Sequence, residues 1–569
     1  MNIFFRSAQG FLAGLALWSL LATPLFAQTN PPAAAEFDLQ KFIDTQIQAG
    51  SHRIVLPPGR WRVTPHDRQH LVLRNLKDVE IVADGCEMIC IETTRALTIA
   101  FCTNVTVRGL TIDYDPLPYT QGRIMSFAEN KKIHEIELFD GYPAADQARN
   151  FKYEIFRPDT RTLRGDDRYS SQVEVVGPRR IRVHVPNGRT NDPEQVGDLI
   201  VIGAEYAPHG STAHAVECSH NVNVRLENID LFASNCFGFI EDNCDGSSYY
   251  RCRIDRRAPA DDLVKRAEAR LRSLDADAFH STSAVKGPSY IECTARFMGD
   301  DAVNIHGDYH LVMAAQNREL RVLAKNEMNL QPGDPVELVT YEGVRLPDAK
   351  VVAVRADGLI RADERDFLSR QKMDAGLKAA KNFLTKAYTV TLDRAEHLPT
   401  GSVLCAANRI GNGFAVKNCQ FGFNRSRGIL IKASHGEISG NRIEGSRMSA
   451  ILVSPEYWWL ESGSSSDLNI SSNSITGCGG IPICVEAFGG DGKISPAGAH
   501  RNITVTGNTI EKCFSPGILM TSTTGLTVAD NRLDLFPATN AIPGQMRQAG
   551  LNTLQPVVKI NCGRQGPAE

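Results

Sequence analysis

The sequence predicts an all-β fold: a right-handed parallel β-helix that carries two inserted small antiparallel β-barrel-like domains. The first observation is a repeat of short apolar strands joined by turns that contain Asn or Gly. Asn418 and Asn441 are 23 residues apart, as are Asn508 and Asn531, and Asn473 continues the series with longer gaps. Asn tolerates the left-handed backbone conformation of such corners, so we expect it to recur there. The leucine ladder of leucine-rich repeats is missing, so the repeat favours β-helix coils.

The second observation is that two long stretches lose this period. Residues 116–213 and 310–410 contain segments that alternate polar and apolar residues, as antiparallel strands do. The chain of 569 residues is also too long for one ordinary hydrophobic core. We therefore expect N-terminal coils at 37–115, an inserted β domain at 116–213, coils with the candidate site at 214–309, a second inserted β domain at 310–410, C-terminal coils at 411–540 and a C-terminal tail at 541–569.

Shorter segments fit the same organisation. Residues 37–63 suit an opening helix and a first strand, and residues 105–112 and 222–229 read as coil strands. A third insertion, from Asp261 to Arg272, has helix propensity and many charges. We expect most of those charges to form a solvated face.

The N-terminus predicts export. Arg6 gives a positive start, Phe11 to Phe26 is an apolar run, and the bond before Gln28 suits signal cleavage. We expect a signal peptide at 1–27, a flexible leader at 28–36, and a periplasmic or secreted mature protein. The alternative is a membrane anchor, but the apolar run is shorter than the ~20 residues needed to span a bilayer.

Composition restricts the partners. Hydrophobic residues make up 42% of the chain and charged residues 22%, which is typical of a folded globular protein. A net charge of −3 gives no indication of nucleic acid or, after signal cleavage, of a membrane as partner. The sequence leaves a homo-oligomer open.

The chain has 14 cysteines, and disulfides are an alternative for an exported protein. Cys252, Cys293, Cys419 and Cys513 each sit near the middle of a short strand, where small buried side chains are expected. We therefore expect interior thiols for many of them. The Cys and His spacings of a structural zinc site are missing.

The candidate site comes from two acidic segments, residues 275–280 and 299–307. Asp277 is 23 and 24 residues before Asp300 and Asp301, close to the coil repeat, so we expect these three residues on neighbouring coils. Carboxylates are costly to remove from water, so a fold that gathers them normally uses them. An inverting glycosidase needs two carboxyl groups ~6.5–9.5 Å apart with room for a water, and neighbouring coils are compatible with that separation.

Consecutive strand residues point to opposite faces, so Asp300 and Asp301 need an irregular backbone to face one groove. Gly299 permits such a bulge or corner. Repulsion among the carboxylates should then keep one protonated as an acid and another ionised as a base.

The alternative is that these aspartates cap turns or, with Asn304, bind a structural calcium ion. His280 and His306 favour a pocket for sugar hydroxyls, because hard cations avoid imidazole ligands. We therefore expect no metal.

Residues 455–463 form a second candidate patch, which holds Trp459 and Glu461. An aromatic face beside a carboxylate suits a pyranose ring, although the patch could equally be a hydrophobic cover over the coils. Arg425, Arg427 and Lys432 on the preceding coil could line the same face. Alternatively, they are solvent-exposed charges.

At these residues the sequence resembles a known family. The segments Asp-Ala-Asp-Ala-x-His and Met-Gly-Asp-Asp-Ala-Val-Asn-Ile-His-Gly, together with Trp-x-Glu-Ser-Gly at 459–463, resemble the signature of glycoside hydrolase family 110, the exo-acting α-1,3-galactosidases. The likeness covers most of the mature chain, since that family also has a β-helix interrupted by inserted β domains.

The resemblance implies inverting hydrolysis of a terminal α-linked galactose, with a carbohydrate partner and no metal or organic cofactor. It implies that Asp300 is the general acid and that Asp277 and Asp301 share activation of the water. The resemblance further implies that galactose is held by His280, Asn304, His306, Trp459 and Glu461. Asp275 has no role in this scheme.

Two rival functions remain. A polygalacturonase-like endo-hydrolase also uses three aspartates on a β-helix, but it needs basic residues along an open groove. Inserted domains beside the site instead favour a closed pocket that recognises a terminal sugar. A non-catalytic glycan-binding β-helix is the other rival.

Overall fold

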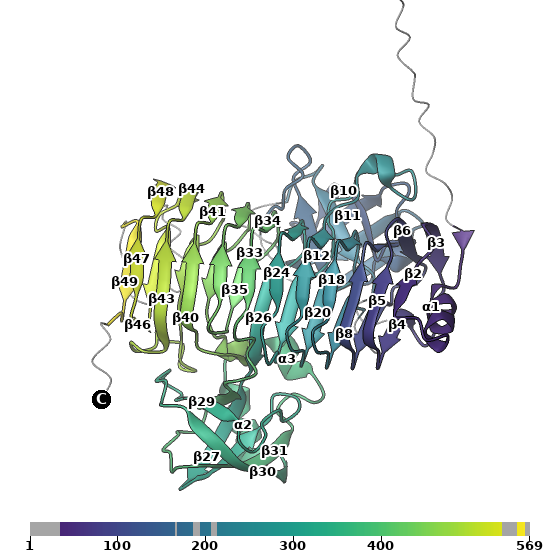
Figure 1. Ribbon diagram of the computed structural model, residues 1–569. Coiled ribbons are helices and arrows are strands. Elements are labelled where there is room, and N and C mark those ends of the chain that lie inside the picture. Colours follow the sequence, from purple (N-terminus) through teal and green to yellow (C-terminus); the bar gives the residue numbers. More distant parts are fainter. Residues whose placement is uncertain (1–34, 166–167, 186–193, 206–212, 538–554, 564–569) are drawn as a thin grey trace, which may run out of the picture. The chain divides into compact units, whose positions relative to one another are not determined.

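The computed structural model describes residues 35–165, 168–185, 194–205, 213–537 and 555–563 (Figure 1). The expected signal peptide at 1–27 and most of the expected leader lie outside these residues. Within the described part of the chain, no helix combines the length and the apolar character needed to cross a membrane.

The described residues contain a right-handed parallel β-helix built from three sheets (Figure 1). One coil runs from sheet 3 to sheet 1 and then to sheet 2. Sheet 1 consists, in spatial order, of β1 (Ala35–Glu36), β3 (Gly59–Val63), β6 (Cys86–Cys90), β9 (Thr111–Tyr114), β19 (Asp230–Leu231), β22 (Arg253–Ile254), β25 (Thr294–Arg296), β34 (Gln420–Gly422), β37 (Arg442–Glu444), β41 (Ser474–Thr476), β44 (Thr509–Phe514) and β48 (Arg532–Phe536).

Sheet 2 consists of β4 (Gln69–Arg74), β7 (Arg95–Ala100), β17 (Val216–Ser219), β20 (Phe239–Asp242), β23 (Phe279–Thr282), β26 (Val303–Asp308), β35 (Ile429–Ile431), β38 (Ile451–Val453), β42 (Ile483–Val485), β45 (Ile518–Thr521) and β49 (Val557–Ile560), with β39 (Glu461–Ser462) paired to β26. Sheet 3 consists of β2 (Arg53–Val55), β5 (Lys77–Val82), β8 (Thr103–Arg108), β18 (Arg225–Glu227), β21 (Ser248–Tyr250), β24 (Ser289–Ile291), β33 (Ala415–Lys417), β36 (Glu437–Ser439), β40 (Ser466–Ser471), β43 (His500–Thr506) and β46 (Thr523–Thr524), with β47 (Thr527–Ala529) paired to β43.

Stacked apolar side chains hold the coils together. Ile305, Ile431, Val453 and Val485 pair in register along sheet 2, and all four are fully buried. Helix α1 (Leu39–Gln48) packs against the first coils through Leu39 and Ile43. Burial of apolar surface at every coil is the main stabilising contribution to such a fold.

Most of the recurring asparagines have a different role from the one that we expected. Asn441, Asn473 and Asn508 are buried, and each of their backbone N–H groups donates at 3.0 Å to the amide oxygen of the next asparagine in the ladder. The left-handed conformation falls on the residue before each of them, as at Gly440 and Ser472. The expectation is correct at Asn418, which is itself left-handed with φ 54°. Asn441, Asn473 and Asn508 instead form a side-chain hydrogen-bond ladder.

The same turn carries cysteine on earlier coils. Cys252, Cys293 and Cys419 occupy the ladder position, and the N–H of Cys419 donates at 2.9 Å to the amide oxygen of Asn441. All 14 cysteines are free thiols, and all but Cys562 are buried. This confirms the expectation of interior thiols.

The first insertion is a seven-stranded antiparallel sheet. Its strands are β10 (Tyr119–Ala128), β11 (Ile133–Leu138), β12 (Lys152–Phe156), β13 (Arg168–Tyr169), β14 (Gln172–Gly177), β15 (Arg180–His184) and β16 (Leu199–Gly203), with a 3-10 turn η1 (Ala145–Gln147). The second insertion is a closed barrel of β27 (His310–Gln316), β28 (Glu319–Leu323), β29 (Pro335–Val339), β30 (Ala349–Leu359), β31 (Lys386–Leu392) and β32 (Val403–Ala406), with helices α2 (Ala362–Arg370) and α3 (Ala375–Ala379).

Two local expectations differ from the structure. The segment from Asp261 to Arg272 forms no helix after the 3-10 turn η2 (Pro259–Asp261) ends at its first residue. Its charges are not mainly a solvated face, because Arg270 and Arg272 are fully buried in ion pairs. Part of the expected tail at 541–569 forms strand β49, which pairs in parallel with β45. The rest of that tail, apart from residues 555–563, lies outside the described residues.

Candidate active site

The two acidic segments lie on the turns that lead from sheet 1 to sheet 2. Asp277 comes just before β23, and Asp300 and Asp301 come just before β26. Because β23, β26 and β35 pair in register, Asp277, Asp301 and Arg427 occupy the same position on three successive coils. The spacing in the sequence therefore correctly places the acidic segments beside each other.

The buried carboxylates make the same kind of hydrogen bond as the asparagine ladder. Asp277 Oδ1 accepts from the backbone N–H of Asp301 at 3.1 Å, and Asp301 Oδ1 accepts from the backbone N–H of Arg427 at 2.7 Å. The Asp301 carboxylate also lies 3.0 Å from the Arg427 guanidinium. The backbone of the following coil thus fixes the direction of each carboxylate.

Asp300 is the accessible member of the three. Its side chain is 30% exposed, against 6% for Asp277 and 2% for Asp301. The guanidinium of Arg425 contacts its carboxylate. A Cβ at Gly299 would lie 2.5 Å from the carbonyl oxygen of Asp275, so only glycine allows this turn to approach the previous coil so closely.

All three carboxylates converge. One oxygen from each of Asp277, Asp300 and Asp301 lies within 4.8 Å of the others. This distance between nearest oxygens is shorter than the separation of carboxyl groups typical of inverting glycosidases, ~6.5–9.5 Å. The sequence prediction that the corner at Gly299 lets neighbouring aspartates approach one point agrees with this geometry.

The environments of the three carboxyls separate their pKa values. Burial and the charges of Asp277 and Asp300 outweigh the favourable Arg427 contact, so the pKa of Asp301 is raised well above its usual range. Burial also raises the pKa of Asp277, against the stabilising hydrogen bond from His280. Burial acts on Asp300 in the same direction, but the charges of Arg425 and Lys152 outweigh it, and the pKa of Asp300 is lowered. In the free protein, Asp301 therefore holds a proton most readily and Asp300 is ionised.

One of these cations comes from the first insertion. Lys152 on β12 donates through Nζ to the backbone oxygens of Asp275 at 2.5 Å and Gly299 at 3.0 Å. Its neighbour on the same strand, Glu154, accepts from Arg272 Nη1 at 2.9 Å. Arg272 Nη1 also donates to Asp275 Oδ1 at 2.7 Å. Asp275, which had no role from the sequence, joins the insertion to the coil that carries the candidate site.

The two histidines form a hydrogen-bonded chain. His306 Nδ1 lies 2.8 Å from the carbonyl oxygen of Gly307, so this nitrogen must be the donor. Burial lowers the pKa of His306 to about 3, so its Nε2 is an acceptor. His280 Nε2, at 3.1 Å, must then donate to His306. His280 Nδ1 and Asp277 Oδ2, 2.8 Å apart, share the one remaining proton.

This arrangement changes the interpretation of His280. Both of its ring nitrogens are occupied, by Asp277 and by His306. Its ring also stacks on Phe237, with centroids 4.5 Å apart. In the free protein His280 therefore orients Asp277 and has no ring nitrogen left for a sugar hydroxyl.

Other expected binding residues lie on the adjoining face of sheet 2. Asn304 is paired across the sheet with His280, and its Oδ1 accepts from Lys432 Nζ at 3.2 Å. Lys432 Nζ also donates to Glu461 Oε2 at 2.7 Å and lies 3.0 Å from Glu456 Oε2. The side chain of Lys432 is fully buried. Lys432 is thus placed beneath the site, where it holds Asn304 and Glu461, and does not line its surface as expected.

Residues 455–463 form a loop that folds back over the candidate site. It contains η3 (Tyr457–Trp459) and strand β39, which pairs antiparallel with the end of β26. This pairing brings Glu461 beside the strand of Asn304 and His306. Trp459 is 38% exposed, as an aromatic platform would need.

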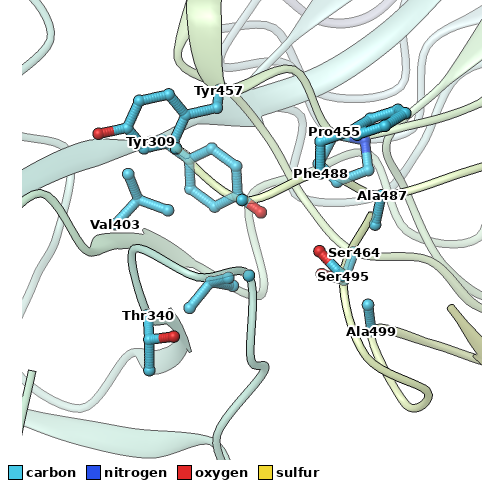
Figure 2. Close-up of a pocket in the computed structure, with 14 residues that line it drawn as sticks. Tyr309, Thr340, Val403, Pro455, Tyr457, Ser464, Ala487, Phe488, Ser495 and Ala499 are labelled. Atoms are coloured by element: carbon cyan, nitrogen blue, oxygen red, sulfur yellow. The ribbon is translucent and has the colours of Figure 1, made fainter. Parts of the chain in front are cut away.

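The barrel of the second insertion supports this loop. Figure 2 shows Tyr309 and Tyr457 on one side of a small cavity, with Pro455 and Phe488 opposite them. Tyr457 donates to the backbone oxygen of Gly401 at 2.9 Å, and Tyr309 donates to Glu337 at 2.9 Å. The cavity volume of about 20 Å³ has room for about one water. It is a packing feature below the loop and not a sugar pocket.

The three aspartates are close enough together to be considered as ligands for a metal ion. Within the described part of the chain, these carboxylates form the one group of His, Cys, Asp or Glu side chains close enough to hold an ion. However, Asp300 already contacts Arg425, and Asp301 accepts from the backbone and guanidinium of Arg427. The negative charges of Asp300 and Asp301, which would attract a cation, are therefore neutralised by the guanidinium groups of Arg425 and Arg427.

Sequence reasoning missed several members of the site. They are Lys152, Glu154, Glu456 and Lys325, of which Lys325 Nζ lies 2.8 Å from Asp308 at the end of β26. Lys152, Glu154 and Lys325 come from the insertions, which carry no repeat to relate them to a coil. Glu456 could have been suspected, because it lies in the patch 455–463.

Comparisons with known proteins agree with the architecture. The family model described as "Right handed beta helix region" matches residues 403–535. The protein named Alpha-1,3-galactosidase B of Bacteroides thetaiotaomicron is 21% identical over 543 residues, which cover 87% of this chain and 82% of that protein. Alpha-1,3-galactosidase A of Shewanella woodyi is 24% identical over 455 residues, which cover 76% of this chain and 69% of that protein.

Among solved structures, the A-module of mannuronan C-5 epimerase AlgE6 of Azotobacter vinelandii is similar with a TM-score of 0.37 at 10% identity, covering 94% of this chain and 97% of that chain. The family match and the three stacked parallel sheets confirm the predicted fold class, a right-handed parallel β-helix.

Proposed function

We propose that this protein is an exported, inverting exo-glycoside hydrolase that releases terminal α-1,3-linked galactose from oligosaccharides or glycans. The observation that carries the proposal is the convergence of Asp277, Asp300 and Asp301 within 4.8 Å. Similarity over most of the chain to proteins named alpha-1,3-galactosidase supports a glycoside hydrolase with a carbohydrate substrate. The linkage, the exo action, the inversion and the export go beyond that similarity and belong to the proposal.

The catalytic roles follow from accessibility. Asp300 is the general acid, because its side chain is the exposed one and can reach the oxygen of a leaving group. As the bond from the anomeric carbon to that oxygen breaks, Asp300 gives its proton to the oxygen. A water attacks the anomeric carbon, and Asp277 and Asp301 share the proton that this water loses.

This assignment places a requirement on the substrate. In the free protein, Arg425 and Lys152 favour the ionised form of Asp300. A proton donor must be protonated when the sugar is bound. The proposal therefore requires that the bound substrate weakens the Arg425–Asp300 ion pair and so moves the proton held by Asp301 to Asp300. The same transfer leaves Asp301 ionised, as a base must be.

Galactose binding is assigned to residues on the outer face of sheet 2 and on the loop over it. Asn304, Glu461 and Arg427 are proposed to hold hydroxyl groups, and Trp459 to stack on the ring. His306 has both ring nitrogens occupied, by Gly307 and His280, so it is proposed to position His280 and not to bind a hydroxyl itself. His280 positions Asp277, and Lys432 keeps Glu461 and Asn304 in place. No metal or organic cofactor is part of the proposal.

Exo action and inversion have separate supports. The loop 455–463 and the two insertions contribute residues around the same site, which favours a closed pocket for one terminal sugar. Inversion is supported by the family resemblance alone, because nearest oxygens within 4.8 Å are below the range between carboxyl groups in inverting enzymes.

The proposed function is tested by incubating the purified protein with galactosyl-α-1,3-galactose, galactosyl-α-1,4-galactose and an oligogalacturonide. Release of free galactose from the α-1,3 disaccharide, and much less from the α-1,4 isomer, is expected. Internal cleavage of the oligogalacturonide would replace the proposal with a polygalacturonase-like function. Sugar binding without cleavage of any substrate would indicate a non-catalytic glycan-binding protein.

A further inference from the structure

A second cavity, of about 770 Å³, lies over the outward face of sheet 1. Outward side chains of β3, β6, β9, β22 and β25 form one wall, and the segment around residues 255–261 forms another. Arg161 of the first insertion closes it on a further side. Its size is within the range of pockets that bind small ligands, roughly 300–1,000 Å³. None of the residues proposed for catalysis or galactose binding lines it.

The lining is dominated by cations. Seven arginines and two phenylalanines line the cavity, against three carboxylates. Six of these arginines have a carboxylate oxygen within 4.0 Å. Arg270, for example, is paired with Asp113 and Asp262, and Arg296 is paired with Asp255.

Arg256 is the exception. Among the described residues, no carboxylate lies within ion-pair distance of its guanidinium. Its Nη1 has one long hydrogen bond, 3.4 Å, to the backbone oxygen of Leu271. The guanidinium carbon lies 3.4 Å from the ring centroid of Phe297, and Phe297 stacks in turn on Phe423. The guanidinium is thus held in place by an aromatic ring but is not neutralised.

An unneutralised cation inside a cavity is unfavourable. Arg256 is partly buried, and removal of its charge from water costs free energy unless an opposite charge is close. Burial and the neighbouring charge of Arg161 lower the pKa of Arg256 to about 10, which reflects the same imbalance. An anion in the cavity would remove this cost and would complete the hydrogen bonds of a planar donor group.

We propose that this cavity binds the carboxylate or sulfate group of an acidic glycan, and that Arg256 is the residue that contacts the anion. A guanidinium matches the paired oxygens of either group. The anion site stands on the cavity and on Arg256 alone, whereas the choice of a glycan as carrier rests on the proposed function.

The location connects this cavity to the candidate active site. Phe297 is three residues before Asp300 on the same turn. An acidic sugar in the cavity would therefore be held by the coil that carries Asp300. The protein would then favour glycans that combine a terminal galactose with an anionic residue elsewhere in the chain.

The test is isothermal titration calorimetry at low ionic strength with trigalacturonate, with neutral galactotriose and with sodium sulfate. Wild type is compared with Arg256→Gln and with the control Arg442→Gln, which removes an exposed charge from the same sheet. We expect trigalacturonate to bind wild type and to bind Arg256→Gln roughly tenfold or more weakly. Arg442→Gln should bind like wild type, and hydrolysis of a small neutral α-galactoside should be unchanged in both variants.

Other outcomes overturn the proposal. Equal affinity of wild type and Arg256→Gln, or no binding of trigalacturonate to wild type, removes the site. Binding of sulfate without binding of trigalacturonate would show that the anion site does not recognise a glycan. Equally tight, salt-independent binding of galactotriose would show that the cavity does not recognise an anion. Should Arg256→Gln fail to fold, the salt dependence of wild-type binding and the variant Arg256→Lys provide the same comparison. Binding is measured without turnover, so failure of the proposed hydrolase function would leave this result interpretable.

Discussion

The backbone N–H of Asp301 donates a hydrogen bond of 3.1 Å to Asp277 Oδ1, and this bond joins the two coils that carry the acidic segments. Arg427 on the next coil repeats the contact with Asp301. The β-helix therefore holds two carboxylates by the same device that its asparagine ladder uses elsewhere. The fold can therefore hold acidic side chains at this position as well as asparagines, because a carboxylate oxygen can replace an amide oxygen as acceptor.

The first prediction concerns the three aspartates. Asp277→Asn, Asp300→Asn and Asp301→Asn should each lower kcat by about 10²–10⁴-fold, the usual contribution of general acid–base catalysis. Asparagine keeps an acceptor for the backbone N–H bonds, so circular dichroism and thermal unfolding should show folded variants. Asp467→Asn, an exposed change on the same β-helix, is the matched control. Wild-type activity in any of the three would remove that residue from the catalytic set.

The second prediction is a change in pH dependence. The guanidinium of Arg425 lowers the pKa of Asp300, so Arg425→Gln should raise it. If Asp300 is the acid, it must be protonated, and the alkaline limb of the kcat/KM profile should move to higher pH. The measurement is kcat/KM for an α-galactoside across pH in both proteins. An unmoved alkaline limb would point to Asp301 as the acid, since the pKa of Asp301 is already raised by burial.

The third prediction concerns the junction between the first insertion and the coils. Arg272 is fully buried and pairs with Glu154 and Asp275. Arg272→Ala should lower the free energy of unfolding by about 3–5 kcal/mol, because it removes the cation paired with the buried carboxylate of Glu154 and the closer of the two cations paired with Asp275. The exposed pair of Arg370 and Asp366 provides the control, and Arg370→Ala should cost about 1 kcal/mol or less. Urea unfolding measures both, and equal costs would show that the buried junction is not stabilising.

The fourth prediction tests the asparagine ladder. Asn473→Ala removes the acceptor for the N–H of Asn441 and the donor to the backbone oxygen of Ile438. Each buried group left unpaired should cost about 1–3 kcal/mol. The control is Asn469→Ala, which changes an exposed residue of β40. It should change the free energy of unfolding by about 0.5 kcal/mol or less. Similar urea midpoints for the two variants would contradict a structural ladder.

The repeat made the β-helix predictable, because each coil must place apolar residues inward and turn residues at corners. It also placed Asp277 beside Asp301, since their separation is one coil. The physical role of the asparagines was not predictable from the residue type, because Asn suits both a left-handed turn and a hydrogen-bond ladder. Only the position of Gly440 and Ser472 separates the two.

The contribution of the insertions could not be predicted. Lys152 precedes Asp275 by 123 residues, and no repeat relates an inserted strand to a coil. The buried Arg270 and Arg272 were also missed, because a charged segment normally remains in water unless partners distant in sequence neutralise it. Both omissions concern ion pairs that close only when the chain is folded.

The anomeric configuration of the first product tests inverting hydrolysis most directly. Wild-type protein is mixed with galactosyl-α-1,3-galactose, and proton NMR follows the released sugar before it mutarotates. We predict that the terminal galactose appears first as the β-anomer. First appearance of the α-anomer would contradict inversion by Asp300 with Asp277 and Asp301, and an absence of released galactose would contradict the hydrolase itself.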